Sequence, residues 1–487
     1  MNILFLAAEA EPFIKVGGLA DVAGSLPPAI QQISDNHIDI RVVIPFHGAL
    51  KRQSLAMHFI THVQLRHYPQ PVEGEIYQLE NTEVPTYLIS GSPLSPEAPV
   101  YTSDSSVDGI KYTFFSLAAL EFCKNINWRP DIIHANDWHT APALYALDVF
   151  KDAFFATTGK IITIHNLPYL GHGAADALGV FGLPPATNSN LPVWAQQLPL
   201  PVGLHAADKI VAVSPTYAKE ILTPDFGAGL DGYLKTRAAD ICGILNGIDY
   251  QLWDPMNDPA ISYPYDVNHL AEKRINKSKI FQDFNLPFPE STFLIGMITR
   301  MDYQKGVDLA LNALDSISNQ PWAAFILGTG SPVLEKAVSQ LEQKLTHKVK
   351  AVIRFDPSLS RKIYAAADLL LIPSRYEPCG LTQMIAMKYG TLPLGRATGG
   401  LKDTITDNHD PAKSCGFLFD KADSNELAQT ILRAMSVYQD EDAWQTMQIN
   451  AMQQDFSWSR SAIKYYNLYK EIQARYQPQL TIPRSNL

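Results

Sequence analysis

The chain has 487 residues, which is long enough for two or three domains, and its 46% hydrophobic and 18% charged residues are typical of a globular protein. Its formal net charge of −10 argues against a nucleic acid or an anionic membrane as a partner, although a local group of cations can still bind a small anion. The four cysteines form no C-x-x-C pair and no apolar run is long enough to span a bilayer, so we expect a cytoplasmic protein.

The chain begins with a short apolar run at residues 3–6, which predicts a buried parallel strand. Lys15 and two glycines, Gly17 and Gly18, follow it, and residues 19–33 predict a helix that two adjacent prolines interrupt. Glycines at such a joint let backbone N–H groups approach an anion, and a lysine adds a positive charge. The stretch therefore predicts either a phosphate-binding loop or a tight turn beside a solvated lysine.

Short apolar runs alternate with helical stretches along the rest of the chain. Buried strands are predicted at residues 39–45, 131–137, 160–166, 208–214, 293–300, 323–330, 350–355, 368–374 and 391–396. The alternation indicates βαβ units with parallel sheets, and the strands are too numerous for one sheet. We therefore expect an α/β protein with two Rossmann-like, doubly wound domains that face each other across a cleft, with ligands bound beyond the carboxyl ends of the strands.

The domain boundary is predicted in a stretch that is rich in Pro, Asp, Asn and Tyr and lacks periodicity. We assign residues 1–248 to an N-terminal domain, 249–268 to a linker and 269–455 to a C-terminal domain. Residues 456–487 would form a C-terminal helix and tail, and we expect this helix to cross back to the N-terminal domain. Packing explains its aromatic stripe better than ligand binding does.

Two cations follow the first strand of the second half. Arg300 and Lys305 lie after that strand, and Gly306 precedes the next predicted helix. A guanidinium group can bind two oxygens at once and a lysine adds a point charge, so the pair suits a diphosphate. A pair of solvated loop cations is the alternative interpretation.

The segment "PSRYEPCGLTQ" is the most unusual part of the second half. The Glu377 carboxylate could accept hydrogen bonds from ribose or sugar hydroxyls, or it could be a solvated loop acid or an N-cap partner. The N–H groups of Gly380, Leu381 and Thr382 precede a helix and could hold a phosphate. The sequence offers no base that would activate Cys379, so we interpret it as a small pocket-lining residue rather than a nucleophile.

Polar residues end three of the predicted strands in the first half. Asp137 could bind a sugar hydroxyl and Trp138 could stack on a sugar face. His165 could act as an acid or base, or contribute its backbone carbonyl, although a single histidine is more often structural. Asn166 follows it directly, and Asn246 ends the third run.

We predict no essential metal and no other cofactor. The acidic run at residues 440–442 resembles a D-x-D motif, but we expect it to begin a helix, where acidic residues interact favourably with the helix dipole. The cations Lys15, Arg300 and Lys305 would instead neutralise a leaving diphosphate.

Eight of these segments resemble the bacterial glycogen synthase and plant starch synthase family, in the family's order and over nearly the whole chain. They are "KVGGLADV", "NDWHTA", "TIHNLPYLG", "GILNGID", "QKGVDL", "ILGTG", "PSRYEPCGLTQ" and "TGGLKDT". The resemblance implies a metal-independent, retaining glucosyltransferase of the GT-B architecture. It implies transfer of glucose from ADP-glucose to the non-reducing 4-hydroxyl of an α-1,4-glucan, which could be glycogen, a starch-like polymer or a malto-oligosaccharide.

The resemblance also assigns roles to individual residues. The catalytic set would be Asp137, His165, Arg300, Lys305 and Glu377. The substrate-binding set would be Lys15, Gly18, Tyr101, Trp138, Asn166, Asn246, Gln304, Phe355, Cys379, Gly380, Leu381 and Thr382. Of these, the aromatic residues Tyr101 and Trp138 and the amide of Gln304 would contact the acceptor. Phe355 would stack on the nucleotide base, although Arg354 stands where many members of the family have a glycine.

Other functions remain as alternatives. The same fold could use UDP-glucose, or could act on maltodextrin instead of a polymer. A non-catalytic sensor of glucan or nucleotide is a second alternative, which the joint presence of Lys15, Arg300, Lys305 and Glu377 disfavours. A phosphorylase-like enzyme with pyridoxal phosphate is a third, but no lysine stands out as the site of its Schiff base.

Overall fold

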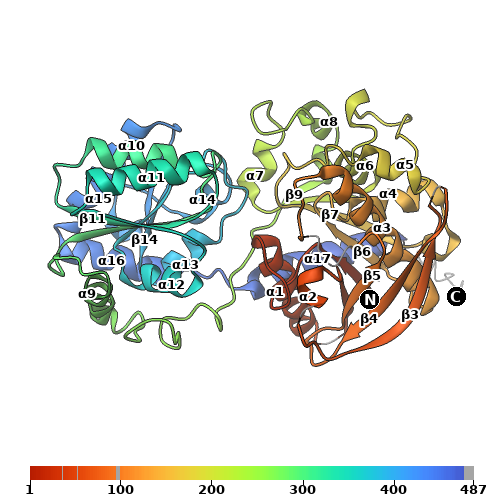
Figure 1. Ribbon diagram of the computed structural model, residues 1–487, viewed down its shortest axis with the longest axis horizontal. Coiled ribbons are helices and arrows are strands. Elements are labelled where there is room, and N and C mark those ends of the chain that lie inside the picture. The colour runs from red at the N-terminus through yellow and green to blue at the C-terminus, as the bar shows by residue number, and fades with distance from the viewer. Residues whose placement is uncertain (36, 52, 68, 95–98, 477–487) are drawn as a thin grey trace, which may run out of the picture. The chain divides into compact units, whose positions relative to one another are not determined.

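The computed structural model describes residues 1–35, 37–51, 53–67, 69–94 and 99–476, and the chain divides into two compact units (Figure 1). The first unit contains residues 1–213 and 218–247 together with the C-terminal helix that begins at Trp458. The second unit contains residues 214–217 and 248–457. Each unit has its own sheet and its own core, as expected for two Rossmann-like domains.

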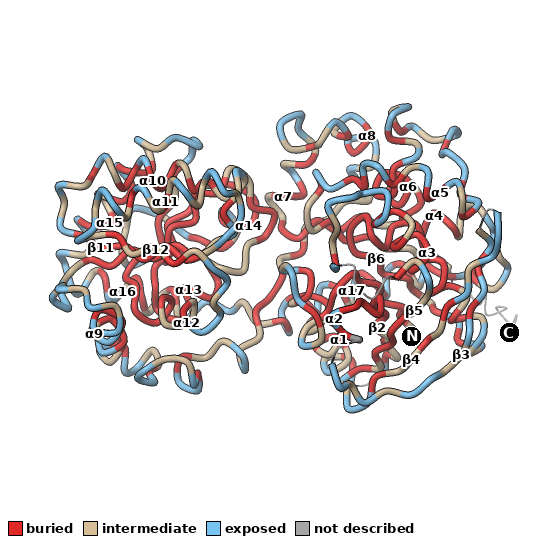
Figure 2. The backbone as a smooth tube through the Cα atoms, in the orientation of Figure 1, coloured by how far each residue is buried: buried red, intermediate tan, exposed pale blue. Residues whose placement is uncertain are grey.

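The first unit is built on a nine-stranded sheet with the strand order β3-β4-β5-β2-β1-β6-β7-β8-β9. The strands are β1 (Asn2–Leu6), β2 (Asp39–Pro45), β3 (Met57–Leu65), β4 (Val72–Leu79), β5 (Thr86–Gly91), β6 (Ile132–Asn136), β7 (Gly159–Ile164), β8 (Lys209–Ala212) and β9 (Ile241–Gly243). The strands from β5 through β2 and β1 to β9 pair in parallel. The central strands are almost entirely buried, which explains why they read as continuous apolar runs (Figure 2).

An antiparallel extension of this sheet was not foreseen from the sequence. β3 pairs antiparallel with β4, and β4 pairs antiparallel with β5. β3 lies at the sheet edge and alternates only weakly between buried and exposed positions. Its residues therefore give neither the apolar run of a buried strand nor the clean alternation of a half-buried one.

Helices surround the sheet of the first unit. They are α1 (Gly18–Ile33), α2 (Gly48–Lys51), α3 (Ser105–Asn125), α4 (Ala141–Phe150), α5 (Ala175–Val180), α6 (Pro199–Ala206), α8 (Asp231–Thr236) and α17 (Trp458–Tyr476), while α7 (Pro215–Glu220) begins in the second unit and ends in the first. The C-terminal helix α17 packs against α1, β6 and β7. Its residues Tyr465, Tyr469 and Ile472 are fully buried, so its aromatic stripe serves packing.

The expected interruption of the first helix at Pro27 and Pro28 is wrong. α1 continues through both prolines to Ile33. Each proline removes a helical hydrogen bond and costs the isolated helix about 3 kcal/mol. Burial compensates for this cost, because Leu26 and Ile30 on either side of the pair are completely buried and the helix packs against α17.

The second unit is a doubly wound sheet with the strand order β12-β11-β10-β13-β14-β15, parallel throughout. Its strands are β10 (Phe293–Ile298), β11 (Trp322–Gly328), β12 (Val349–Ile353), β13 (Leu369–Ile372), β14 (Leu392–Arg396) and β15 (Phe417–Phe419). Its helices are α9 (Lys273–Asp283), α10 (Val307–Ser316), α11 (Pro332–Lys344), α12 (Pro357–Ala366), α13 (Thr382–Lys388), α14 (Gly399–Thr404), α15 (Ser424–Tyr438) and α16 (Glu441–Met452).

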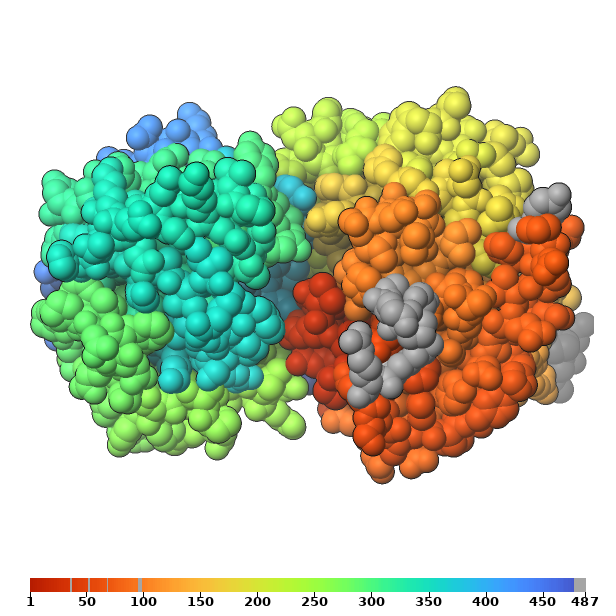
Figure 3. Space-filling view, viewed as in Figure 1, coloured from red at the N-terminus to blue at the C-terminus, as the bar shows by residue number. Residues whose placement is uncertain are grey.

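Alternate residues of the central strands enter two separate hydrophobic clusters. Ile295 of β10 belongs to the cluster with α10, α11, α15 and α16, whereas Leu294 belongs to the cluster with α9 and α12. Figure 1 shows α10 and α11 on one face of this sheet and α12 on the other, and Figure 3 shows green to cyan side chains of this unit covering the surface that is turned to the viewer. This two-sided burial is the signature of a doubly wound parallel sheet.

Residues 249–268, which we expected to be a linker, pack onto the second unit. Tyr265 is fully buried and donates a hydrogen bond from its hydroxyl to the carbonyl of Tyr389 at 2.8 Å. Asp258 is buried and accepts hydrogen bonds from Arg361 and from the Tyr389 hydroxyl, at 3.0 and 2.5 Å. The composition of the segment reflects irregular backbone, not freedom from contacts, because its aromatic and acidic side chains have buried partners.

Among the described residues, no helix is both long and apolar enough to cross a membrane.

Candidate functional site

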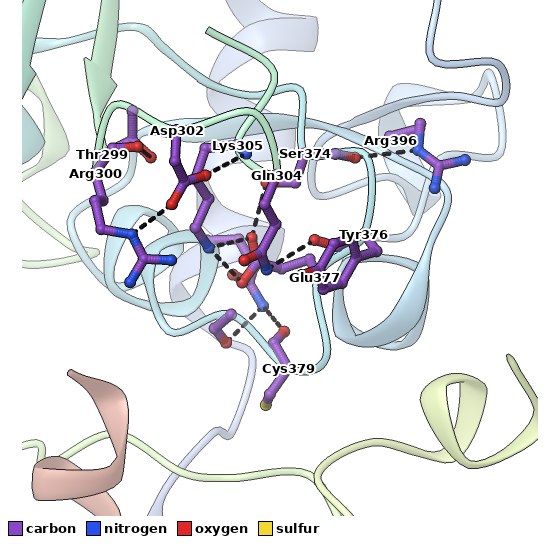
Figure 4. Close-up of polar contacts among 12 residues, drawn as sticks. Thr299, Arg300, Asp302, Gln304, Lys305, Ser374, Tyr376, Glu377, Cys379 and Arg396 are labelled. Atoms are coloured by element: carbon purple, nitrogen blue, oxygen red, sulfur yellow. Dashed lines mark hydrogen bonds and ion pairs between the residues drawn. The ribbon is translucent and has the colours of Figure 1, made fainter. Parts of the chain in front are cut away.

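In the second unit, the loops after β10 and β13 meet at the carboxyl edge of the sheet. The Lys305 ammonium donates to both oxygens of Glu377 at 2.8 and 2.7 Å (Figure 4). Ser374 Oγ donates to the same carboxylate at 2.8 Å, and Glu377 is only 6% exposed. The interpretation of Glu377 as a solvated loop acid is therefore wrong, since it is a buried carboxylate with fixed partners.

A glycine turn brings these two loops together. Gly306 ends the loop after β10 with a φ of +64°, in the left-handed region that favours glycine. A Cβ at this position would lie 2.0 Å from the carbonyl oxygen of Pro373, the residue before Ser374. The close approach of the two backbones therefore requires a glycine, and it places Lys305 next to the loop that carries Glu377.

A cavity of about 110 Å³ lies beside the Lys305–Glu377 pair, and Arg300 contributes to its lining. The lining consists of the ends of β10 and β13 together with Arg300, Lys305, Ser374, Glu377, Gly380, Thr382 and Gln383. The Arg300 guanidinium is largely exposed and is paired with Asp302, whose other oxygen accepts a hydrogen bond from the Lys305 backbone at 3.0 Å. Two cations thus line one cavity, and a guanidinium and an ammonium together suit a phosphate-bearing ligand.

The loop that enters α13 forms another wall of this cavity. Gly380 has a φ of +71°, and Leu381 is the N-cap of α13. The Gln383 amide donates to the carbonyls of Cys379 and Gly380 at 3.0 and 2.9 Å, while its own Oε1 is buried without a partner in the described part of the chain. Gln383 was not predicted from the sequence, and its unsatisfied oxygen marks it as a group that a ligand could use.

The "TGG" segment at the start of α14 packs against the backbone of the Glu377 loop. A Cβ on Gly399 would lie 2.0 Å from the carbonyl oxygen of Glu377, and one on Gly400 would lie 1.9 Å from that of Cys379. The Gly400 N–H donates to the Glu377 carbonyl at 3.0 Å. This Gly-Gly pair therefore fixes the backbone that carries the buried carboxylate and the Cys379 side chain, which is itself 5% exposed.

The remaining predicted residues of the second unit lie beside this cavity or away from it. Gln304 precedes Lys305 and donates to the carbonyl of Tyr376 at 3.2 Å. Phe355 follows β12, is 81% exposed and does not line the cavity. The stacking role that the resemblance implies for Phe355 stays a prediction.

In the first unit, Asp137 follows β6 and organises the end of the neighbouring strand. It accepts hydrogen bonds from the backbone N–H groups of His165 at 2.7 Å and Asn166 at 3.4 Å. Burial raises the pKa of Asp137 to about 7, against the lowering effect of these two bonds. Burial also lowers the pKa of His165 to about 3, so its imidazole is neutral at physiological pH.

Aromatic rings pack beside Asp137. The His139 ring lies 4.3 Å from the Trp138 ring and 5.0 Å from the Tyr101 ring, measured between centroids. Trp138 is only 8% exposed and also contacts Tyr112 edge-on. The indole therefore offers little of its face for stacking, whereas Tyr101 remains partly exposed.

A buried glutamate occupies the backbone amides of the glycine loop. Glu9 accepts hydrogen bonds from the N–H groups of Val16 and Gly17 and, at 3.0 Å, from the Tyr101 hydroxyl. Burial raises the pKa of this carboxyl group, while the two backbone hydrogen bonds lower it. Glu9 was not among the predicted residues, although an acid within the buried apolar stretch that continues past β1 was a signal that could have identified it.

Lys15 does not present a free charge in this arrangement. Its ammonium pairs with Glu11 at 2.9 Å and with Asp21 at 2.7 Å. Gly18 is the first residue of α1 and follows the N-cap residue Gly17. A phosphate at this loop would therefore compete with three carboxylates, those of Glu9, Glu11 and Asp21.

Several buried side-chain polar atoms of the first unit have no hydrogen-bond partner in the described residues, and three of them lie on or beside predicted site residues. These three are His139 Nδ1, Asn166 Oδ1 and Asn246 Oδ1. Buried polar groups are nearly always satisfied in folded proteins, so such atoms are candidates for ligand contacts. Asn166 and Asn246 are predicted site residues, whereas His139 was not selected from the sequence. Among the residues that the structure describes, no group of three or more His, Cys, Asp or Glu side chains could hold a metal ion.

Comparison with known proteins agrees with this division. Residues 2–236 match a family described as the starch synthase catalytic domain, and residues 278–450 match the family glycosyl transferases group 1. The chain is 38% identical to a glycogen synthase of Thermotoga maritima, over 98% of this chain and 99% of the relative. It is also 38% identical to a glycogen synthase of Clostridium perfringens, over 97% of this chain and 98% of the relative.

Solved structures show the same relationship. The catalytic domain of starch synthase IV from Arabidopsis thaliana, bound to ADP and acarbose, superposes with a TM-score of 0.88 and 30% identity, covering 97% of this chain and 99% of that one. A sucrose-phosphate synthase from Thermosynechococcus elongatus, at 18% identity and a TM-score of 0.61, shares the fold. The two α/β units, the paired cations at a strand end and the full-length similarity lead to one conclusion: this chain belongs to the glycogen synthase and starch synthase family of GT-B glycosyltransferases.

Proposed function

We propose that the protein is a glycogen synthase that transfers glucose from ADP-glucose to the non-reducing 4-hydroxyl of an α-1,4-glucan, with retention of configuration. The observation that carries this proposal is the cavity of the second unit, where Arg300 and Lys305 lie beside the buried Glu377 carboxylate. The ADP bound to the Arabidopsis starch synthase supports a nucleoside diphosphate donor, and the acarbose bound to the same protein supports a glucan acceptor.

In this proposal, the second unit binds the donor. Arg300 and Lys305 would neutralise the diphosphate as the bond between its oxygen and the glucose C1 breaks toward an oxocarbenium-like state. Glu377 would orient the sugar or the leaving group while it holds the Lys305 ammonium in place. The amides of Gly380, Leu381 and Thr382 and the side chain of Phe355 would contact the donor.

The first unit would supply the contacts to the transferred sugar and to the acceptor. Asp137, Asn166 and Asn246 would bind sugar hydroxyls, and the orphaned oxygens of the two asparagines support this role. His165, neutral at physiological pH, would lie near the reacting carbon. The acceptor hydroxyl would attack the face that the diphosphate leaves, and a phosphate oxygen would take its proton, so no protein base is required.

The experiment that tests this function is transfer of labelled glucose to glycogen. Purified protein is incubated with glycogen and either ADP-glucose or UDP-glucose, with and without a chelator. We expect labelled polymer and released ADP from ADP-glucose, with no effect of the chelator. Faster transfer from UDP-glucose would contradict the donor assignment, and binding of ADP-glucose without release of ADP would show a sensor in place of an enzyme.

A further inference from the structure

A second, larger cavity lies at the opposite end of the sheet of the second unit. Its volume is about 630 Å³, and its lining includes Ser291, which precedes β10, and Asp368, which precedes β13. α9, α16 and the end of α15 form its other walls. The cavity with Lys305 lies at the carboxyl ends of the same strands, so this one is a separate site. Its volume falls in the range of small-molecule binding sites.

The buried cations of this cavity are not available to an anion. The Lys273 ammonium donates to the carbonyls of Tyr364 and Ala365 and to Thr391 Oγ1, at 2.8 to 3.0 Å. The Lys277 ammonium donates to Asp368 at 2.7 Å and also to a backbone carbonyl and a tyrosine hydroxyl. An ammonium group has three N–H donors, so both lysines are fully used.

The rim of the cavity is polar, and its Arg274 is paired with Glu441. The lining of the whole cavity contains equal numbers of basic and acidic side chains: Lys273, Arg274 and Lys277, and Glu290, Asp368 and Glu441. The exposed rim also contains Ser291, Gln439 and Gln445. A phosphate would have to displace Glu441 from Arg274, whereas neutral hydroxyls can bond to both members of the pair at once.

One donor in the wall of this cavity has no partner. Trp444 lines the cavity and is 4% exposed, and its Nε1 has no hydrogen-bond acceptor in the described residues. A buried indole N–H normally finds an acceptor. An oxygen-rich ligand in the cavity could supply it.

We infer that this cavity is a binding site for a neutral saccharide, and that in this protein its ligand is a segment of the glucan. The choice of glucan among saccharides rests on the proposed function. A polymer that is held here while one of its chain ends reacts at the other edge of the sheet gains effective concentration at the transfer site. The site therefore favours long glucans and leaves short acceptors unaffected.

The test uses a rim variant and a matched control. The double variant Arg274→Ala/Glu441→Ala removes the charged pair without changing the net charge of the cavity. The control, Lys344→Ala/Asp315→Ala, removes another exposed ion pair of the same unit that does not line this cavity. We expect the rim variant to raise the KM for glycogen roughly tenfold, a small part of the gain that multivalency can give. Its kcat, its KM for maltotriose and all values of the control should stay unchanged.

A second measurement does not depend on catalysis. Electrophoresis through a gel that contains glycogen should retard the Lys305→Ala protein strongly. The same protein with the additional substitutions Arg274→Ala and Glu441→Ala should be retarded less. Equal retardation of the two proteins, or an unchanged KM for glycogen, would overturn the inference. The wild-type protein is also run with inorganic phosphate and with sodium chloride of the same ionic strength. Loss of retardation with phosphate alone would identify an anion site and would also overturn the inference. Failure of glucose transfer alone would count against the proposed function only.

Discussion

The Lys305 ammonium and the Glu377 carboxylate depend on each other. Each is largely withdrawn from water, and Ser374 holds the same carboxylate, so the three groups have one defined geometry. A charge that is fixed before the substrate arrives needs no reorganisation when the diphosphate departs. In the proposed function, this pairing would hold the lysine ammonium in one position beside the diphosphate.

Replacement of this cation tests its role directly. We expect Lys305→Ala to lower turnover with ADP-glucose by about 10²–10³-fold, as for the loss of one positioned charge-stabilising group. The control is Lys350→Ala, which removes a cation that pairs with Glu342 at 2.9 Å and does not line the cavity. Rates are compared at saturating substrate, with thermal unfolding of both variants to show that they are folded. A Lys305→Ala protein with near-normal turnover would refute the assignment.

Asp137 carries a pKa of about 7 because burial disfavours its charged form. A carboxyl group that binds its proton more tightly in the folded state than in the unfolded state makes the protein less stable as pH rises. For Asp137 this loss begins near the unfolded value of 3.8 and is complete above pH 7.

The variant Asp137→Asn removes this dependence. Asparagine retains an oxygen for the N–H groups of His165 and Asn166, and it tolerates the φ of +55° at this position. We expect the variant to gain stability relative to wild type between pH 4 and pH 7, by at most ~1.4 kcal/mol per pH unit. Urea unfolding of both proteins at several pH values measures the difference. A constant difference across that range would show that the carboxyl group titrates normally.

At the scale of elements, a glycine turn determines how closely the loops after β10 and β13 of the second unit approach each other. Gly306 caps α10 in a left-handed conformation, in contact with the carbonyl of Pro373. The position of Lys305 relative to Glu377 is therefore a property of the β10–α10 connection, and not of the lysine side chain alone.

We expect Gly306→Ala to destabilise the second unit by about 1–3 kcal/mol, because the new Cβ adds backbone strain and a clash. Turnover should fall as well, since the loop that carries Lys305 must move. The control is Gly232→Ala in α8, where a Cβ would meet nothing within 4 Å and alanine should add about 0.5–1 kcal/mol of stability. The stability and the turnover of the two variants are compared by thermal unfolding and by an activity assay. Equal effects of the two substitutions would show that the Gly306 turn is not a constraint.

At the scale of the whole molecule, the chain returns to its first unit at its C-terminal helix. Tyr469 of α17 donates to or accepts from His134 Nδ1 at 2.6 Å, although 335 residues separate the two positions. The other ring nitrogen of His134 bonds to Thr163 Oγ1 at 2.7 Å. Burial lowers the pKa of His134 to about 3, so the ring stays neutral and both of its nitrogens are satisfied.

Loss of this contact should weaken the first unit. We expect Tyr469→Phe to lower the free energy of unfolding by about 1–3 kcal/mol, because a buried ring nitrogen loses its partner. The control is Tyr466→Phe on the same helix, which leaves a partly exposed ring beside Lys470 and should change stability by less than about 0.5 kcal/mol. Chemical unfolding that gives the same value for both variants would mean that water replaces the tyrosine hydroxyl.

The buried parallel strands were predicted well because burial on both sheet faces imposes an apolar run. β2, β6, β7 and β8 of the first unit and β10 to β14 of the second lie where such runs were identified. The strands β3, β4 and β5 and the three-residue strands β9 and β15 were missed. β3 and β4 belong to the antiparallel extension and contain no continuous apolar run, and the apolar runs of β5, β9 and β15 are very short. The prolines of α1 misled the prediction because local propensity yields to burial against a helix from the far end of the chain.

The sequence alone determined that βαβ units occur in both halves of the chain, that the chain resembles a known family, and at which strand ends polar residues gather. These are local patterns along the chain. Only the tertiary structure decided which of those residues have partners. It joined Lys305 to Glu377, engaged Lys15 with two carboxylates, placed Glu9 under the glycine loop and left Gln383, His139 and Asn166 with unsatisfied atoms. The physical reason is that hydrogen bonding and burial depend on side chains brought together from distant segments, and no local pattern specifies those distances.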